Sequence, residues 1–237
     1  MAATMKHGFC LAIGLLASGA AAEPGRGAVL VELFTSQGCS SCPPADLFLH
    51  ELADRRDVIA LSLHVDYWDY LGWKDRFGSP AHSDRQRAYA AAMKDRMVYT
   101  PQIVVEGRER LVGSQVDAVL SAIETRLAEP EDAQIVLTLD GDTIVVEVSS
   151  ASGRPEAALV LMAWYTESER VSIAAGENAG REAVYRNVVR GWKTIGNWSG
   201  ETTRLEAPAP KDADAVVVIL QRPDGGPVLC SKRIDLR

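Results

Sequence analysis

Two cysteines separated by only two residues are the part of this sequence best suited to chemistry. They form the motif Cys39-Ser40-Ser41-Cys42. A disulfide between them would close a very small loop and would add little stability through chain entropy. Two neighbouring thiols can instead exchange electrons with another molecule, because the second thiol can attack a mixed disulfide formed by the first. We therefore expect a redox-active pair rather than a structural crosslink.

The residues on either side of the pair indicate how it is positioned. Residues 28–34 are apolar and predict a buried strand. Residues 43–55 begin with two prolines and continue with a helical pattern, and proline is tolerated in the first turn of a helix. A thiol at a helix N-terminus meets unpaired N–H groups and the positive end of the helix dipole, which both favour the thiolate. We expect Cys39 to attack and Cys42 to resolve the mixed disulfide.

A second strand and a Thr-Pro pair are expected at the same place. Residues 58–64 predict a buried strand parallel to the first, because the length of the intervening segment fits a β-α-β unit. Thr100 and Pro101 precede a strand at 102–106, and X–Pro bonds are the common place for a cis peptide. If that strand runs antiparallel to the first two, Thr-Pro, the dithiol and residues 64–66 share one edge of the sheet.

Four further side chains are candidates for this site. His64 and Asp66 lie at the shared edge, although a histidine there can also serve only a local hydrogen bond. Trp68 belongs to the aromatic and acidic stretch 66–73, whose rings either line a substrate groove or pack an insertion onto the core. Glu32 lies within the first apolar strand, where burial without a partner would raise its pKa. Glu32 is a candidate site residue, and the alternative is a structural ion pair.

The order of these features is similar to that of the thioredoxin-like family over about residues 28–127. The runs VELFTSQGCSSCPPAD (31–46) and HVDYWD (64–69) further resemble the exported DUF1223 family, whose function is unknown. The thioredoxin-like resemblance implies that Pro101 faces the dithiol and helps to hold substrate. It also implies that an acid on the first strand relays protons to the resolving thiol. Glu32 departs from that pattern, because it lies one residue farther from the cysteine than usual.

The predicted fold is α/β with two domains. We expect a thioredoxin-like domain over residues 28–128 with a helical insertion at about 66–98. An acidic stretch with a proline at 129–132 indicates a boundary, and residues 140–142 give a strong hairpin signal beyond it. We expect residues 133–237 to form a β-rich, sandwich-like C-terminal domain packed on the first.

The N-terminus indicates export. Residues 9–16 are apolar and an alanine-rich cleavage pattern follows, so we place a signal peptide at residues 1–22. The apolar run is shorter than the roughly 20 residues of a membrane span, and no later segment is long and apolar enough to cross a bilayer. A periplasmic or secreted location is expected. Of the three remaining cysteines, Cys230 is expected to be a small buried apolar residue, with an intermolecular disulfide as the alternative.

Composition narrows the classes of partner. The chain has 237 residues, of which 47% are hydrophobic and 24% charged, as in a soluble globular protein. Its net charge of −7 argues against nucleic acid as a partner. We predict a thiol–disulfide oxidoreductase that acts on protein or small-molecule thiols and disulfides, without a cofactor or a resident metal.

Two binding functions remain as alternatives to the enzyme. Thiolates of the pair suit copper(I), and His64 or His82 would supply a third ligand. Tetrahedral zinc is a poorer match, because it needs four ligands and the sequence has no second CxxC. The other alternative is a non-catalytic thioredoxin-like adaptor whose β-rich half docks a partner.

Overall fold

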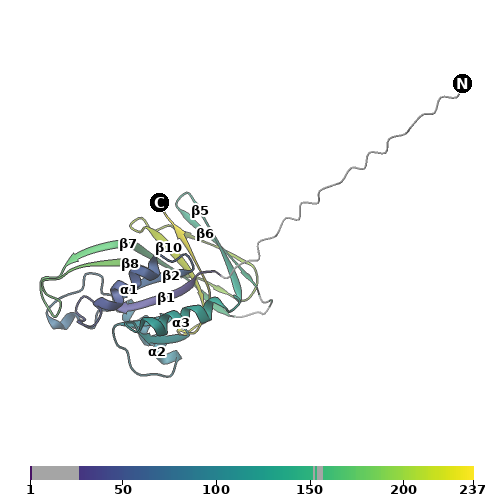
Figure 1. Cartoon of the computed structure of the whole chain (residues 1–237). Helices are drawn as coiled ribbons and strands as arrows, with labels where there is room; N and C mark the ends of the chain where they lie inside the picture. The colour runs from purple at the N-terminus through teal and green to yellow at the C-terminus, as the bar shows by residue number, and fades with distance from the viewer. Residues whose placement is uncertain (2–26, 152, 154–156) are drawn as a thin grey trace.

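The computed structural model describes residue 1, residues 27–151, residue 153 and residues 157–237 (Figure 1). Apart from residue 1, the expected signal peptide lies outside the described residues. The elements follow one another in this order: β1 (Val29–Thr35), α1 (Pro43–Ala53), β2 (Val58–His64), the 3₁₀ turn η1 (Asp69–Leu71), α2 (Pro80–Ala92), β3 (Gln102–Val105), β4 (Glu109–Val112), α3 (Val116–Leu127), β5 (Ala133–Asp140), β6 (Thr143–Ser150), β7 (Ala158–Ser172), β8 (Glu182–Trp198), β9 (Thr203–Pro208), β10 (Ala215–Gln221) and β11 (Val228–Asp235).

Most strands belong to one mixed sheet of eight. Its strand order is β11-β10-β7-β8-β2-β1-β3-β4, and β5-β6-β9 form a separate sheet of three. β1 and β2 run parallel, with Thr35 opposite His64 at their ends, and β3 runs antiparallel to β1. The pairing that joins the two halves of the chain is between β2 and β8, which run parallel with Ser62 opposite Val188.

The predicted fold class, a thioredoxin-like domain followed by a β-sandwich domain, is wrong. The described ranges contain eleven strands and only three α-helices, and four strands from the second half of the chain extend the sheet that begins with β1. The open edge of β2 is completed by β8, because unpaired strand edges require a hydrogen-bonding partner. Apolar patterns reveal where strands lie along the chain, and they do not reveal which strands pair when they are as far apart as Ser62 and Val188.

The helices cover both faces of the β1–β2 region. α1 and α3 pack on the face that carries Val29, Val31 and Leu33. The opposite face carries Leu30 and Phe34, and Tyr89 of α2 packs there together with apolar residues of β10. Successive side chains of a strand point to opposite faces, so these two clusters fix the direction of every side chain on β1.

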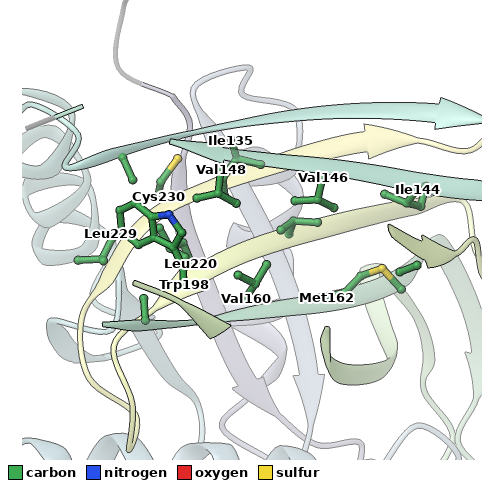
Figure 2. Close-up of a cluster of buried hydrophobic side chains, with 14 of the residues drawn as sticks. Ile135, Ile144, Val146, Val148, Val160, Met162, Trp198, Leu220, Leu229 and Cys230 are labelled. Atoms are coloured by element: carbon green, nitrogen blue, oxygen red, sulfur yellow. The ribbon is translucent and has the colours of Figure 1, made fainter. Parts of the chain in front are cut away.

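A further core lies between the small sheet and the second half of the large sheet (Figure 2). Ile144, Val146 and Val148 of β6 face Val160 of β7 across this core. Cys230 of β11 lies in the same cluster and is 5% exposed, as the sequence led us to expect. Its thiol is free, and burial is the main reason that its pKa is raised far above the usual value.

The helix boundaries follow local chemistry. α1 begins with its two prolines, as expected. The second helix was expected over about residues 83–97, but α2 begins at Pro80, where the Oγ of Ser79 accepts the backbone N–H of Ala81. Ser114 was expected to cap the third helix, but Gln115 occupies the N-cap position. Among the described residues, none of the helices has the length and apolar character that a membrane span requires.

β7 and β8 form a long two-stranded ribbon. The sequence indicated strands only over about 158–164 and 184–189, because the polar residues beyond them break the apolar pattern. In the structure the two strands stay paired as far as Ser172 and Glu182. Their connecting turn lies at the end of the molecule where β1 ends and α1 begins (Figure 1).

Candidate functional site

The two cysteines of the motif form a disulfide between the end of β1 and the start of α1. The two Cα atoms lie 5.4 Å apart. Cys39 keeps 3% of its surface exposed and Cys42 none, while Ser40 and Ser41 between them are exposed. The Oγ of Ser41 lies 3.5 Å from the sulfur of Cys39. A reacting molecule therefore meets the serines first and Cys39 next, and Cys42 is the more protected sulfur.

The start of α1 offers the sulfurs less direct hydrogen bonding than the sequence suggested. Cys42 occupies the N-cap position, and the two prolines that follow have no N–H group. The next two amides, of Ala45 and Asp46, both donate to the carbonyl oxygen of Cys42, at 2.9 and 3.1 Å. The helix dipole remains as the influence that favours a thiolate at Cys42.

The Thr100-Pro101 pair lies against the disulfide loop. The peptide bond between the two residues is cis. The Oγ of Ser41 donates to the carbonyl oxygen of Thr100 at 3.5 Å. Pro101 and Ala45 of α1 both come close to Gly113, where a Cβ atom would lie 3.1 and 3.0 Å from theirs. The Thr-Pro pair, the loop and the first turn of α1 thus meet at one place.

Trp68 covers one side of the disulfide loop. Its indole N–H donates to the Oγ1 of Thr100 at 2.8 Å. A Cβ atom on Gly38 would lie 3.1 Å from the Cβ of Trp68, so the indole residue packs directly on the residue before Cys39. Tyr70 stacks on Trp68 with 6.4 Å between ring centroids and is 77% exposed. These rings form an aromatic surface beside the disulfide.

Asp46 is the titratable carboxyl group nearest in sequence to the buried sulfur, one helical turn after Cys42. Its Oδ1 accepts the hydroxyl of Thr35 at 2.7 Å. Burial raises the pKa of Asp46 from 3.8 to about 7, although attraction to His64 and the hydrogen bond from Thr35 lower it in part. A carboxyl group with this pKa can both give and accept a proton near neutral pH.

His64 and Asp75 form a buried pair beside Asp46. The Nδ1 of His64 lies 2.7 Å from the Oδ2 of Asp75, and both side chains are fully buried. Asp75 also accepts the backbone N–H groups of Gln37 and Phe77, at 2.8 and 2.9 Å. Burial alone would raise the pKa of Asp75, but His64 and these two donors hold it below its usual value.

The second ring nitrogen of His64 has no hydrogen-bond partner among the described residues. The imidazole instead packs in T-shaped contacts with the rings of Phe77 and Tyr185, with centroids 5.2 and 4.6 Å away. Among the described residues, the side chain of His64 thus makes its polar contact with Asp75, which assigns it a positioning role.

Asp66 is held in a different way from the other candidates. Its carboxylate accepts the hydroxyl of Ser83 at 2.5 Å, and its backbone N–H donates to the same hydroxyl at 3.3 Å. Ser83 belongs to α2, so this contact ties the segment after β2 to that helix. Asp66 thus has a structural partner of its own, and the same is true of Glu32.

Glu32 points to the face of the sheet opposite α1. It lies on β1 between Val31 and Leu33, which both face α1. Its carboxylate accepts the Nε and Nη2 of Arg85, at 2.5 and 3.1 Å, and the hydroxyl of Tyr89. Glu32 therefore belongs to a buried ion pair. Asp46, in contrast, lies on the face of the sheet that carries α1 and the disulfide.

A residue from the β7–β8 turn clamps the disulfide loop. The side-chain Nδ2 of Asn178 donates to the carbonyl oxygens of Gln37 and Cys39, both at 2.9 Å. Asn178 lies 139 residues beyond Cys39 and is 3% exposed. Nothing in the local sequence could have indicated this contact. Asp46 could have been found, because a helix brings residues four apart onto one face.

The described residues contain no group of three His, Cys, Asp or Glu side chains arranged to hold a metal ion. His82, considered as a copper ligand, uses its Nδ1 on the carbonyl oxygen of His64 at 2.9 Å. Burial lowers the pKa of His82 to about 4. No observation favours the copper(I) alternative.

Comparisons with known proteins give a family and a fold. A crystal structure of a protein from Agrobacterium tumefaciens aligns with a TM-score of 0.79 and 29% identity, over 90% of this chain and 96% of that one. HBP35 of Porphyromonas gingivalis aligns with a TM-score of 0.60 and 14% identity, over 89% of this chain and 76% of that one. The second likeness concerns the fold alone.

Sequence comparison agrees with the resemblance noted from the cysteine motif. The search of curated proteins returns no match. A family model described as a protein of unknown function, DUF1223, matches residues 30–221. Since this match covers most of the chain, the protein belongs to the DUF1223 family.

Proposed function

We propose that this protein is an exported thiol–disulfide oxidoreductase whose redox centre is the Cys39–Cys42 disulfide. The observation that carries the proposal is the position of the disulfide, at the N-terminus of α1 and at the ends of two parallel strands. Two exposed serines lie between its cysteines. The proposal uses the likeness to thioredoxin-like proteins only for the dithiol and the neighbouring Thr-Pro pair. It does not use a likeness of the overall fold.

The reaction is an exchange of two electrons with a substrate dithiol. A substrate thiolate attacks the Sγ of Cys39, the Cys39–Cys42 bond breaks, and Cys42 leaves as a thiolate. The second substrate thiolate attacks the mixed disulfide, so that the substrate leaves with its own disulfide and Cys39 becomes a thiolate. The two protons of the substrate dithiol end on Cys39 and Cys42. The reverse sequence reduces a substrate disulfide.

The roles of the two cysteines follow from their exposure. Cys39 is the residue of the pair that retains exposed surface, so it forms the mixed disulfide with substrate. Cys42 is fully buried and takes or loses its proton inside the protein. Asp46 supplies or accepts that proton, because its carboxyl group is buried beside the first turn of α1 and titrates near neutral pH. The proton relay first assigned to Glu32 thus belongs to Asp46 in this proposal.

Two residues beside the disulfide complete the substrate-binding surface. The carbonyl oxygen of Thr100 accepts the exposed hydroxyl of Ser41 at the long distance of 3.5 Å, so a substrate backbone N–H can compete for it. Trp68 and Tyr70 supply an aromatic surface next to this carbonyl. An extended peptide that carries a cysteine fits both features.

The test uses residues 23–237, which correspond to the chain after the proposed signal peptide is removed. The oxidised protein is mixed with a reduced peptide that carries two cysteines, and peptide disulfide is measured by mass spectrometry. We expect one disulfide per protein molecule, and none with Cys39→Ser. When the same peptide is supplied in its disulfide form, Cys39 of Cys42→Ser should attack it and be trapped as a mixed disulfide, with the other peptide sulfur released as a thiol. Cys230→Ser should oxidise the reduced peptide like the parent. Equal peptide oxidation by the parent and Cys39→Ser would discard the proposal.

A further inference from the structure

A cavity of about 310 Å³ opens beside the first turn of α1. It lies between this helix and the start of β8, so its two sides come from opposite halves of the chain. Its walls are largely apolar and are formed by Pro43, Leu47, Ile173 and Val184. The cavity is separate from the aromatic surface of Trp68, because none of the aromatic residues 67–73 lines it.

The cavity is lined by acceptors of Asp46, Asn178 and Glu182 and by the donor-bearing side chains of Ser36, Arg181 and Tyr185. Asn178 uses its Nδ2 on the carbonyl oxygens of Gln37 and Cys39, which fixes the orientation of the amide. Its Oδ1 is buried and has no partner among the described residues. The carboxyl group of Asp46 also lines the cavity. Buried acceptors are normally satisfied, so this cavity is suited to a ligand that brings donors.

Resting on the proposed function, we propose that this cavity binds the lysine side chain of a substrate polypeptide, next to the cysteine that reacts with Cys39. The methylene groups of lysine would contact Leu47 and Val184, and its ammonium group would donate to the Oδ1 of Asn178 and to Asp46. An ammonium group has three donors and no acceptor, so it can serve the Oδ1 of Asn178 and the Asp46 carboxyl group together.

Charge complementarity favours lysine over an acidic side chain. Asp46 lies within the cavity and Glu182 at its rim, and both repel a carboxylate when ionised. Arg181 is the cation of the lining, but it is exposed, so water and salt screen its attraction for an anion. A purely apolar side chain would fill the walls and leave the Oδ1 of Asn178 without a donor.

The experiment compares peptides that differ at one position. Each peptide carries a single cysteine with lysine, norleucine or glutamate at one of the two positions on either side. The second-order rate of mixed-disulfide formation with Cys39 is measured in the Cys230→Ser protein. At the best position we expect lysine to react about tenfold faster than norleucine, and glutamate more slowly than both.

One exposed leucine and one exposed valine provide a matched pair of lysine variants, one at the cavity and one away from it. Leu47 is 65% exposed at the cavity, and Val136 is 55% exposed on β5 in the small sheet. Leu47→Lys places a cation at the cavity and should bring the lysine-to-norleucine ratio close to one. Val136→Lys makes the same change of charge elsewhere and should keep the parent ratio. Equal ratios in both variants would overturn the lysine pocket.

The outcomes separate this inference from the proposed function. If mixed disulfides form on Cys39 at equal rates with all peptides, the lysine pocket is wrong and the oxidoreductase proposal stands. If no peptide reacts, the oxidoreductase proposal fails, and the pocket is then judged by binding alone. A fluorescent lysine peptide with serine in place of cysteine should bind the parent and bind Leu47→Lys at least fivefold more weakly. Absence of binding, or equal binding to both, would overturn the pocket.

Discussion

Asp75 and Gln37 are joined by a hydrogen bond of 2.8 Å, from the backbone N–H of Gln37 to the Oδ2 of Asp75. The same oxygen lies 2.7 Å from the Nδ1 of His64. A buried histidine–carboxylate pair is thus attached directly to the segment that leads into Cys39. This hydrogen bond connects the disulfide loop to the buried pair.

Replacing Asp75 should destabilise the fold and loosen the loop. Asp75→Ala leaves a buried histidine and two backbone N–H groups without their acceptor, which we expect to cost about 3 kcal/mol of unfolding free energy. The pKa of Asp75 is lowered below 3.8, so its stabilisation is complete above about pH 4 and is lost as pH falls through the folded-state pKa. Urea unfolding at pH 7 measures the cost, and an unchanged midpoint would contradict it.

Asp46 should give both the reaction and the stability a dependence on pH. Its folded-state pKa of about 7 exceeds the unfolded value near 3.8, so the folded state binds the proton more tightly. Stability should therefore fall as pH rises from about 4 to 7, by on the order of 4 kcal/mol. Asp46→Asn keeps an acceptor for Thr35 and removes the charge. Urea unfolding of this variant should show a much smaller loss of stability over the same range.

The exchange rate should report on the same carboxyl group. We expect the rate of mixed-disulfide resolution in the parent protein to change near pH 7, and Asp46→Asn to lack that inflection. Stopped-flow measurements with a dithiol peptide between pH 5 and pH 9 would show it. Matching profiles for parent and variant would remove Asp46 from the mechanism.

Glu32 should matter for stability and not for exchange. Glu32→Gln removes the charge that neutralises Arg85 in a buried pair, which we expect to cost about 3 kcal/mol. Glu32 lies on the face of the sheet opposite α1, so the pH profile of exchange should keep the parent shape. Urea unfolding tests the expected loss of stability, and the same stopped-flow series tests the expected pH profile of exchange. A lost inflection would return the proton relay to Glu32.

Asn178 should restrain the disulfide loop. Asn178→Ala removes two hydrogen bonds to the loop, so we expect dithiothreitol to reduce the disulfide several-fold faster and stability to fall by about 2 kcal/mol. Asn187→Ala is the control, because its Nδ2 donates to the carbonyl oxygen of Ala60 in the middle of β2. It should lower stability and leave the reduction rate unchanged. Equal rates in the two variants would mean that the clamp has no effect on the disulfide.

The sequence supported local predictions better than distant ones. The strand at 58–64 was predicted with the bounds that the structure has, because its apolar run is uninterrupted and ends at turn residues. The α1 start followed from its prolines. The pairing of β2 with β8 could not be predicted. The apolar pattern of each strand indicates burial and does not indicate a partner, and the segment between the strands does not determine the register of their pairing.

For the candidate site, too, residues close together in the sequence were predicted and distant ones were missed. Cys39, Cys42 and Thr100 were found from motifs that are contiguous in the sequence. Asn178 was missed, since an asparagine in a turn has no local pattern that reports a carbonyl partner 139 residues away. Glu32 was chosen for its place in an apolar strand, and strand alternation alone does not say which face carries the disulfide.

The partnership of β2 with β8 also limits how this chain can be divided. A fragment that ends at residue 128 would leave one side of β2 bare and would lack the asparagine that holds the loop. Bare strand edges recruit further strands, so such a fragment should assemble with its own copies. Anyone who expresses, crystallises or engineers the cysteine-bearing half must therefore keep the β7–β8 ribbon with it.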